Sequence, residues 1–223
     1  MNYTIFLLIE HKIKILKPIH TNQYPHKQNM EPINHHGRPA STIVISMLQH
    51  SRGGDGKMEP TPLNPIVKEY VNLAFHGMRA CEESINVDID LQLGENVGEV
   101  PLIAEDFSRV ILNLCNNALD AIRTLSAEHS AHGENYDPKL TIRTQSYANT
   151  ITLEIEDNRP GIHDEIKDKI LQSFFTTKKG TQGTGLGLSI TNDIIKAHGG
   201  ELDIKSEPEN GAIFSIHIPI FLR

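Results

Sequence analysis

Five stretches of the chain alternate between hydrophobic and polar residues. This period of two is typical of a strand that buries one face and exposes the other. The stretches predicted to be strands are residues 87–93, 140–146, 151–156, 202–205 and 212–218. Only short turn-forming segments separate the second stretch from the third and the fourth from the fifth. Each of these two pairs is therefore predicted to form a hairpin.

Other stretches place hydrophobic residues three and four positions apart, which is typical of a helix with one buried face. They cover residues 40–49, 66–84, 106–124, 164–174 and 186–198. The last of these helices is predicted to end at Gly199 and Gly200, which tolerate a positive φ. Hairpins with helices between them favour an α/β (α+β) fold, in which helices cover one face of a mixed, mainly antiparallel sheet.

Composition divides the 223 residues into four parts. Residues 1–38 are rich in Lys, His, Asn, Gln and Pro without a hydrophobic period, and they are predicted to be irregular. Residues 39–52 are predicted to hold a short N-terminal helical segment, and residues 53–64 are predicted to be a linker from their Gly and Pro content. The regular pattern fills residues 65–223, which are predicted to form the main domain.

Charge and cysteine content narrow the class of protein. The formal net charge is -7, so no basic excess points to nucleic acid as a partner. Cys81 and Cys115 lie in hydrophobic helical patterns, and we interpret them as small buried side chains in a reducing, cytoplasmic compartment. The hydrophobic segment Ile5–Ile9 is too short to span a bilayer, so no membrane segment is predicted.

Two asparagines lie in the strongly hydrophobic helix predicted for residues 106–124. Asn113 and Asn117 are four residues apart, so both amides project from one face of the helix. An amide oxygen is a hard, neutral ligand that suits Mg²⁺ or a water bound to it. The alternative is an ordinary polar surface position, although the neighbouring residues are mainly hydrophobic.

Two further motifs follow in the chain. Asp157–Ile162 comes directly after a predicted strand, where a carboxylate can accept a hydrogen bond from an exocyclic amine and Gly161 lets a flat ring approach. An ordinary β-turn is the alternative. The stretch 174–180 combines two phenylalanines with two lysines, which either lie near a phosphate or are simply solvated.

A glycine-rich run precedes the helix predicted for residues 186–198. Gly183, Gly185 and Gly187 leave backbone N–H groups free to surround phosphate oxygens at a helix N-terminus. The run is not a P-loop, because no Gly-Lys-Ser/Thr follows at the required spacing. A dinucleotide-binding fingerprint also fails, because Leu188 stands where the last glycine is needed.

In order and spacing, these four stretches resemble the asparagine box, first glycine box, phenylalanine box and second glycine box of the catalytic, ATP-binding domain of sensor histidine kinases. The corresponding boxes in this chain are Asn113–Ala118, Asp157–Ile162, Phe174–Lys178 and Gly183–Leu188. The domain is part of a superfamily shared with DNA gyrase, mismatch-repair ATPases and a heat-shock chaperone. The resemblance covers about residues 65–220 and implies a two-layer α/β sandwich.

The resemblance also implies roles for individual residues. Asn117 would coordinate Mg²⁺, Asn113 would help to hold the metal and the phosphates, and Asp157 would accept the adenine amino group. Lys178 lies at the base of a mobile lid and could meet the terminal phosphate, so Asn113 and Lys178 are the candidate catalytic residues. The other cofactor-binding residues would line the adenine slot or wrap the phosphates: Gly161, Ile162, Thr177, Gly183, Thr184, Gly185, Leu186 and Gly187.

One position separates branches of the superfamily. The resemblance implies that hydrolysing members carry a water-activating glutamate one helical turn before the metal-binding asparagine, where this chain has Asn113. A neutral amide is a poor general base. Transfer of the γ-phosphoryl group is therefore expected rather than its loss to water, and steady-state ATP hydrolysis is predicted to be slow.

The chain also departs from the family pattern. Arg159 stands where the family usually has glycine, which predicts a stiffer or partly obstructed adenine loop. Asp120 occupies a position where some members direct a lysine towards phosphate. None of the twelve histidines lies in a phosphoacceptor motif. Residues 33–52 resemble only the second helix of the dimerisation hairpin, so we interpret residues 39–52 as its remnant and do not expect stable dimerisation through it.

The resemblance thus implies an ATP- and Mg²⁺-binding protein histidine kinase of a two-component system, a phosphotransferase that is incomplete because it lacks its acceptor. Its partners would be a histidine-bearing dimerisation hairpin, from another chain or an upstream portion, and a response regulator receiver domain. Three alternatives stay open. They are a nucleotide-binding regulatory module without kinase activity, a serine kinase of the anti-sigma type, and a structural or interaction protein that binds no ATP.

Overall fold

The computed structural model describes residues 56–79, 85–132, 136–159, 161–178, 183–206 and 211–220. The predicted irregular segment 1–38 and the predicted helix 40–49 lie outside these residues. No helix in the described ranges is both long enough and apolar enough to cross a membrane.

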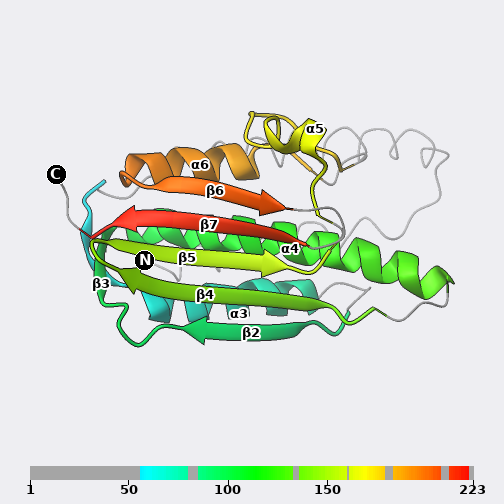
Figure 1. Ribbon diagram of the computed structural model, residues 1–223, viewed down its shortest axis with the longest axis horizontal. Helices are drawn as coiled ribbons and strands as arrows, with labels where there is room; N and C mark the ends of the chain where they lie inside the picture. Colours follow the sequence, from blue (N-terminus) through cyan, green and yellow to red (C-terminus); the bar gives the residue numbers. More distant parts are fainter. Residues whose placement is uncertain are drawn as a thin grey trace, which may run out of the picture. The chain divides into compact units, whose positions relative to one another are not determined.

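Five strands form one sheet, in the order β2-β4-β5-β7-β6 (Figure 1). The strands are β2 (Asp88–Leu93), β4 (Lys139–Tyr147), β5 (Thr150–Asp157), β6 (Glu201–Ser206) and β7 (Ala212–Pro219). Strands β2 and β4 are parallel, whereas the other three neighbouring pairs are antiparallel. The prediction of a mixed, mainly antiparallel sheet is therefore confirmed, and each predicted strand is present within one or two residues of its expected bounds.

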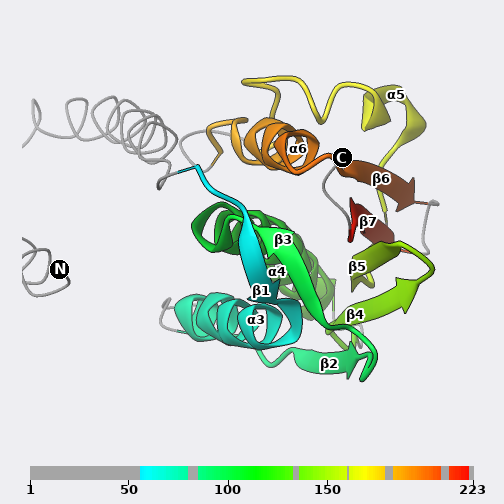
Figure 2. The same cartoon turned by 90° about the vertical axis from the view of Figure 1, so that its left-hand side faces the viewer.

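Three helices cover one face of this sheet (Figure 2). They are α3 (Leu63–Arg79), α4 (Ala104–His132) and α6 (Gly187–Ala197). Alternate residues of β4 and β5 turn towards these helices, so that Leu140, Ile142 and Leu153 are at most 1% exposed. They pack in one core cluster with residues of α4 such as Phe107 and Ile111. The two layers thus follow from the periods of two and 3.6 in the sequence.

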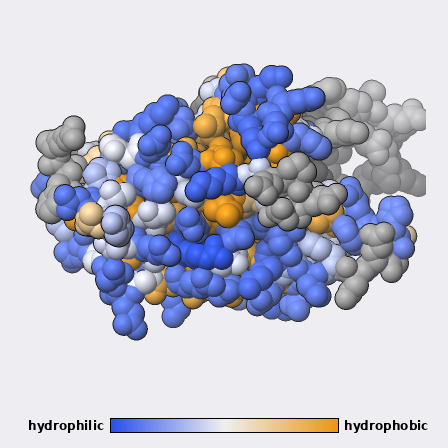
Figure 3. Space-filling view, viewed as in Figure 1, coloured by the Kyte–Doolittle hydropathy of each residue, from blue (hydrophilic) through white to orange (hydrophobic). Residues whose placement is uncertain are grey.

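The opposite face of the sheet is polar. Arg143 on β4 pairs with Glu154 and Glu156 on β5, and its Nε donates to Gln92 on β2. Figure 3, seen from this side, shows mainly hydrophilic side chains, apart from a strip of hydrophobic ones near the middle of the view. One face of each strand therefore packs in the core while the other carries cross-strand charge pairs.

A second, two-stranded sheet pairs β1 (Glu59–Pro62) with β3 (Glu99–Leu102) in antiparallel register. Neither strand was predicted, and β1 lies within the stretch 53–64 that was interpreted as a linker. Pro60 and Pro62 cannot donate ladder hydrogen bonds, which makes such a segment look unlike a strand from its sequence. A short edge pairing tolerates these prolines, and the buried Leu102 connects β3 to the core.

Three helices differ from their predicted bounds. Helix α3 begins three residues before the predicted stretch 66–84, whose last five residues lie outside the described ranges. Helix α4 extends beyond residues 106–124 at both ends. The prediction of a helix over residues 164–174 is correct only for α5 (Asp164–Lys167). It is wrong for the following residues, which form turns, and Phe174 has a φ of 68°. A residue in this left-handed region cannot continue a right-handed helix. The helix predicted for residues 186–198 is confirmed by α6.

A buried histidine fixes α6 relative to the start of α4. His198 lies directly after α6 and is 3% exposed. Its Nδ1 lies 2.8 Å from the carbonyl oxygen of Ile194, and its Nε2 accepts a hydrogen bond from the N–H of Ile103 at 3.0 Å. Because Nε2 accepts, the ring proton is on Nδ1. The first turn of α6 is thereby held beside the middle of α4, where the candidate site lies.

Candidate functional site

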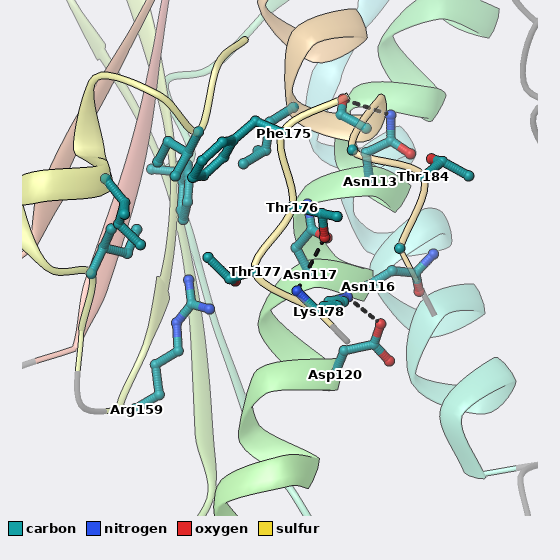
Figure 4. Close-up of a pocket in the computed structure, with 18 of the residues that line it drawn as sticks. Asn113, Asn116, Asn117, Asp120, Arg159, Phe175, Thr176, Thr177, Lys178 and Thr184 are labelled. Carbon is teal, nitrogen blue, oxygen red and sulfur yellow. Dashed lines mark hydrogen bonds and ion pairs between the residues drawn. The ribbon is translucent and has the colours of Figure 1, made fainter. Parts of the chain in front are cut away.

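A cavity of about 510 Å³ lies between α4, the N-terminus of α6 and the segment that joins β5 to α6 (Figure 4). Its polar lining residues are Asn113, Asn116, Asn117, Asp120, Arg159, His163, Thr176, Thr177, Lys178 and Thr184. Its apolar side chains are Ile162, Ile166, Ile170, Phe175, Leu188 and Phe214, and Gly161, Gly183, Gly185 and Gly187 complete the wall. A volume of this size is typical of a small-molecule site.

Helix α4 presents two amides to the cavity. The Nδ2 of Asn113 donates to the carbonyl oxygen of Gly187 at 3.3 Å and to Oγ1 of Thr191 at 3.5 Å. Within the described part of the chain, the Oδ1 of Asn113 and the whole side-chain amide of Asn117 form no hydrogen bond. Such amide oxygens fit Mg²⁺, which prefers oxygen ligands and commonly keeps water and phosphate in its shell.

Gly187 keeps the space beside these amides open. A Cβ at this position would lie 3.9 Å from Asn113 and Asn117. Gly187 is the first residue of α6, and its N-cap residue, Leu186, provides no side-chain hydrogen bond to the helix. The first N–H groups of a helix have no partner within the helix and favour an anion. The amides of α4 and the N-terminus of α6 therefore border the same part of the cavity.

The glycine-rich segment is locked against the phenylalanine stretch by its backbone. The N–H of Phe174 donates to the carbonyl oxygen of Gly185 at 2.8 Å. Gly185 has a φ of 66°, and a Cβ there would lie 2.4 Å from the carbonyl carbon of Phe174. Only glycine fits this position, because both its backbone conformation and the contact exclude a side chain. Two consecutive motifs of the sequence are thus joined at the cavity rim.

Lys178 is held at the cavity wall by a charged partner on α4. Its Nζ donates to Oδ2 of Asp120 at 2.7 Å, and its N–H donates to Oγ1 of Thr176 at 3.1 Å. The side chains of Lys178 and Asp120 are 33% and 43% exposed. Such a partly solvated pair contributes little to stability. The ammonium group can therefore exchange Asp120 for another anion at little cost.

Asp157, the last residue of β5, is 1% exposed. Its neighbours in register on the adjoining strands are Leu140 and Ala212, whose side chains donate no hydrogen bond. Its Oδ1 lies 2.8 Å from Nε of Arg159 and accepts a hydrogen bond from the Arg159 N–H at 3.3 Å. Its buried Oδ2 has no partner in the described structure. Burial raises the pKa of Asp157 to about 6, and the charge of Arg159 opposes this rise.

The loop after β5 is fixed by a buried hydroxyl. Oγ of Ser206 accepts a hydrogen bond from the N–H of Ile162 at 2.7 Å and donates to the carbonyl oxygen of Gly211 at 2.8 Å. Gly211 itself is so close to Asp157 that a Cβ would lie 2.2 Å from the Asp157 carbonyl oxygen. The ends of β5, β6 and β7 thereby hold the apolar wall around Ile162 in place.

Ten of the twelve binding residues predicted from the sequence line the cavity, and two do not. Leu186 is 8% exposed and faces the core, and its N–H donates to Oγ1 of Thr184 at 3.4 Å. Asp157 lies behind Arg159. Sequence reasoning missed the apolar residues Ile166, Ile170 and Phe214. They occupy hydrophobic positions of the helix and strand patterns, so the sequence does not distinguish them from ordinary core residues.

Comparison with known proteins identifies the family of the chain. Residues 103–221 match the family of histidine kinase-, DNA gyrase B- and HSP90-like ATPases. The signal transduction histidine-protein kinase AtoS of Escherichia coli is 32% identical over 179 residues, which are 80% of this chain and 26% of AtoS. The C4-dicarboxylate transport sensor protein DctB of Pseudomonas aeruginosa is 27% identical over 85% of this chain and 29% of that protein.

Solved structures show the same fold. The catalytic domain of the histidine kinase ThkA superposes with a TM-score of 0.60 at 28% identity, over 74% of this chain and 96% of that domain. ThkA in complex with the response regulator TrrA gives a TM-score of 0.62 at 25% identity, over 97% of this chain and 57% of ThkA. The chain therefore belongs to the histidine kinase-, DNA gyrase B- and HSP90-like ATPase family, as its motifs predicted. It spans between a quarter and a third of the length of AtoS and DctB.

Proposed function

We propose that this chain is the ATP- and Mg²⁺-binding catalytic part of a two-component sensor histidine kinase, and that it transfers the γ-phosphoryl group of ATP to a histidine. The observation that carries this proposal is the convergence of four features on one cavity. They are the Asn113 Oδ1 and the Asn117 amide, which have no partner among the described residues, Lys178 and the glycine-rich segment. Phosphoryl transfer depends mainly on positioning and charge stabilisation, which these groups can supply.

The base would lie at the end of the cavity formed by the loop after β5. The apolar side chains of Ile162, Ile170 and Phe175 would pack against its faces. Gly161, with a φ of 86°, lets the loop turn without a side chain in the slot. Asp157 would accept a hydrogen bond from the exocyclic amine once Arg159 releases it.

The phosphates would lie at the opposite end, beside α4. Asn117 would hold Mg²⁺ through its amide oxygen and Asn113 would help to orient the phosphates. When bound, Mg²⁺ would neutralise charge on the phosphate oxygens. Lys178 would leave Asp120 for the terminal phosphate, and the N–H groups at the start of α6 would face the phosphate oxygens.

The acceptor would come from outside the described residues. A histidine on a dimerisation hairpin, from another chain or from an upstream portion, would receive the phosphoryl group and pass it to a response regulator. Support comes from the similarity to the signal transduction histidine-protein kinase AtoS and the sensor protein DctB, and from the solved complex of ThkA with the response regulator TrrA. Asn113 is a neutral amide and therefore a poor general base for activating water. This favours transfer of the γ-phosphoryl group over hydrolysis of ATP.

A titration with ATP and Mg²⁺ tests the binding part of the proposal. Asn117→Ala and Asp157→Asn should each weaken binding by about tenfold or more, because the first removes a proposed ligand of Mg²⁺ and the second removes the charge of a hydrogen-bond acceptor. Asn192→Ala on α6 is the matched control, because Asn192 does not line the cavity. Wild-type affinity in both site variants would contradict the proposal.

Radiolabelled ATP tests the transfer part. Incubation with a histidine-bearing helical hairpin should yield an acid-labile phosphoprotein. An acid-stable product would indicate a serine kinase of the anti-sigma type instead. ATP binding without any labelled product would indicate a regulatory nucleotide-binding module.

A further inference from the structure

Arg159 covers the carboxylate that the proposed function assigns to base recognition. Its side chain reaches back to Asp157, two residues earlier, and its Nε lies 2.8 Å from Oδ1. Arg159 lines the cavity, whereas the buried Asp157 does not. Figure 4 shows the guanidinium end of Arg159 pointing into the cavity from the side away from α4. A base that enters the slot therefore meets this arginine before it meets the aspartate.

The terminal nitrogens of Arg159 are available to a ligand. Its contacts within the described residues are those of Nε and of the backbone N–H with Asp157. A guanidinium group only donates hydrogen bonds and has no acceptor. At the end of the cavity proposed for the base, Arg159 therefore offers hydrogen-bond donors. An uncovered Asp157 would offer a hydrogen-bond acceptor there instead.

Adenine and guanine differ at the edge that meets such a group. Adenine carries an amine at position 6, whereas guanine and hypoxanthine carry an oxygen there, and N7 is an acceptor in all three. Arginine pairs well with the O6 and N7 of guanine. A 6-oxopurine can accept hydrogen bonds from Arg159 while the pair with Asp157 stays intact. Adenine must displace the guanidinium to present its amine to Asp157.

We propose that Arg159 is a specificity-determining residue that makes this site accept 6-oxopurine nucleotides at least as well as adenine nucleotides. This inference rests on the proposed function, because it assumes that the cavity binds a purine nucleotide. It concerns which nucleotide is the phosphoryl donor and leaves the roles of the α4 amides unchanged.

The test is a titration of the whole chain with the Mg²⁺ complexes of ATP, GTP and ITP. The wild-type chain should bind GTP at least as tightly as ATP. ITP, which lacks the 2-amino group, should bind about as well as GTP, since the oxygen at position 6 carries the recognition. In Arg159→Gly, Asp157 is uncovered, so the ratio of GTP to ATP affinity should fall at least about tenfold.

Two further variants sharpen the test. Arg159→Lys keeps a cationic donor and should retain part of the GTP affinity. Arg143→Ala removes an ion-paired arginine from the opposite face of the sheet and should leave the ratio of the two affinities unchanged. Circular dichroism and melting temperature show that each variant is folded before it is titrated.

The outcomes separate this inference from the proposed function. If wild type binds ATP more tightly than GTP, or if Arg159→Gly binds the two nucleotides in the wild-type ratio, Arg159 does not set base preference and the inference is overturned. If neither wild type nor Arg159→Gly binds any of the three nucleotides, the proposed function fails as well. The inference is supported if the ratio of GTP to ATP affinity is lower in Arg159→Gly than in wild type and takes an intermediate value in Arg159→Lys.

Discussion

The two ends of the cavity are built differently. At the loop after β5, Asp157 and Ser206 are buried and take part in fixed contacts with Arg159, Ile162 and Gly211. At α4, the amide of Asn117 has no partner among the described residues and Lys178 is a partly exposed member of an ion pair. The end proposed for the base is therefore organised by the protein itself. The end proposed for the phosphates leaves its ligand-binding groups to be ordered by the ligand.

The largest effect is expected between the two ends, where the glycine-rich segment meets the phenylalanine stretch. In Gly185→Ala, the new Cβ would lie 2.4 Å from the Phe174 carbonyl carbon, and the φ of 66° would be strained. We expect a loss of unfolding free energy of about 2 kcal/mol or more and nucleotide binding reduced about a hundredfold. Urea unfolding and titration measure the two effects.

Gly187→Ala is the matched control for this change. Its Cβ would have no contact closer than 3.9 Å, so we expect stability close to that of wild type. Equal stability losses in the two variants would show that the contact between Phe174 and Gly185 is unimportant.

A second prediction separates the two ends by their ligands. Asn117→Ala should weaken Mg²⁺-dependent ATP binding about tenfold or more and leave the affinity for adenosine unchanged. Ser206→Ala removes the acceptor for the Ile162 N–H. This variant should therefore lower the affinities for adenosine and for ATP by the same factor. Titrations of both ligands measure this difference. If both variants affect both ligands equally, the division of the cavity is wrong.

A third prediction concerns pH at the base end. Ionised Asp157 is a stronger acceptor for a hydrogen bond from an amine than protonated Asp157, and its pKa is raised to about 6 by burial. Adenosine affinity should be constant above pH 7 and should fall as the pH drops through about 6. The neighbouring charges of Arg159 and Glu156 act on the same carboxyl group in opposite directions. Asp157→Asn should show a flat profile in the same titration.

The same pKa affects stability. Between its ordinary value of 3.8 and about 6, Asp157 binds more protons in the folded chain than in the unfolded chain. Its contribution to the unfolding free energy therefore falls as the pH rises through this window. The difference in unfolding free energy between Asp157→Asn and wild type should change across it, which urea unfolding at several pH values measures.

The smallest effect is expected at the ion pair of the phosphate end. Asp120→Asn removes a carboxylate that competes with phosphate for Lys178. ATP affinity should rise by a few-fold at low salt, and the gain should shrink as ionic strength increases. Adenosine affinity should not change. A loss of ATP affinity would instead indicate that Asp120 helps to hold a metal-bound water.

Local pattern and motif order predicted much of this molecule. The strands β4 and β5 and the helix α4 have strong periods, and the spacing of Asn113 and Asn117 places both amides on one helical face. The four motifs predicted ten residues of the cavity wall. These features depend on residues close together in the sequence, so a single sequence contains the information.

Other features depend on the packing of distant segments. The pair Lys178–Asp120 joins residues 58 positions apart, and Phe174 takes a positive φ to meet Gly185. The substitution at Arg159 could be recognised from the sequence as a departure from the family. The sequence could not show that the Arg159 side chain covers Asp157, because this contact depends on where the chain turns after β5. The proline-rich strand β1 was missed because its sequence has no strand period.

The most direct test of the central claim is a crystal structure of the chain with Mg²⁺ and a non-hydrolysable purine nucleotide. We predict that the metal lies within bonding distance of the Asn117 Oδ1 and that the base contacts the loop after β5 beside Ile162. A nucleotide bound outside this cavity, or a metal with no contact to α4, would contradict the account.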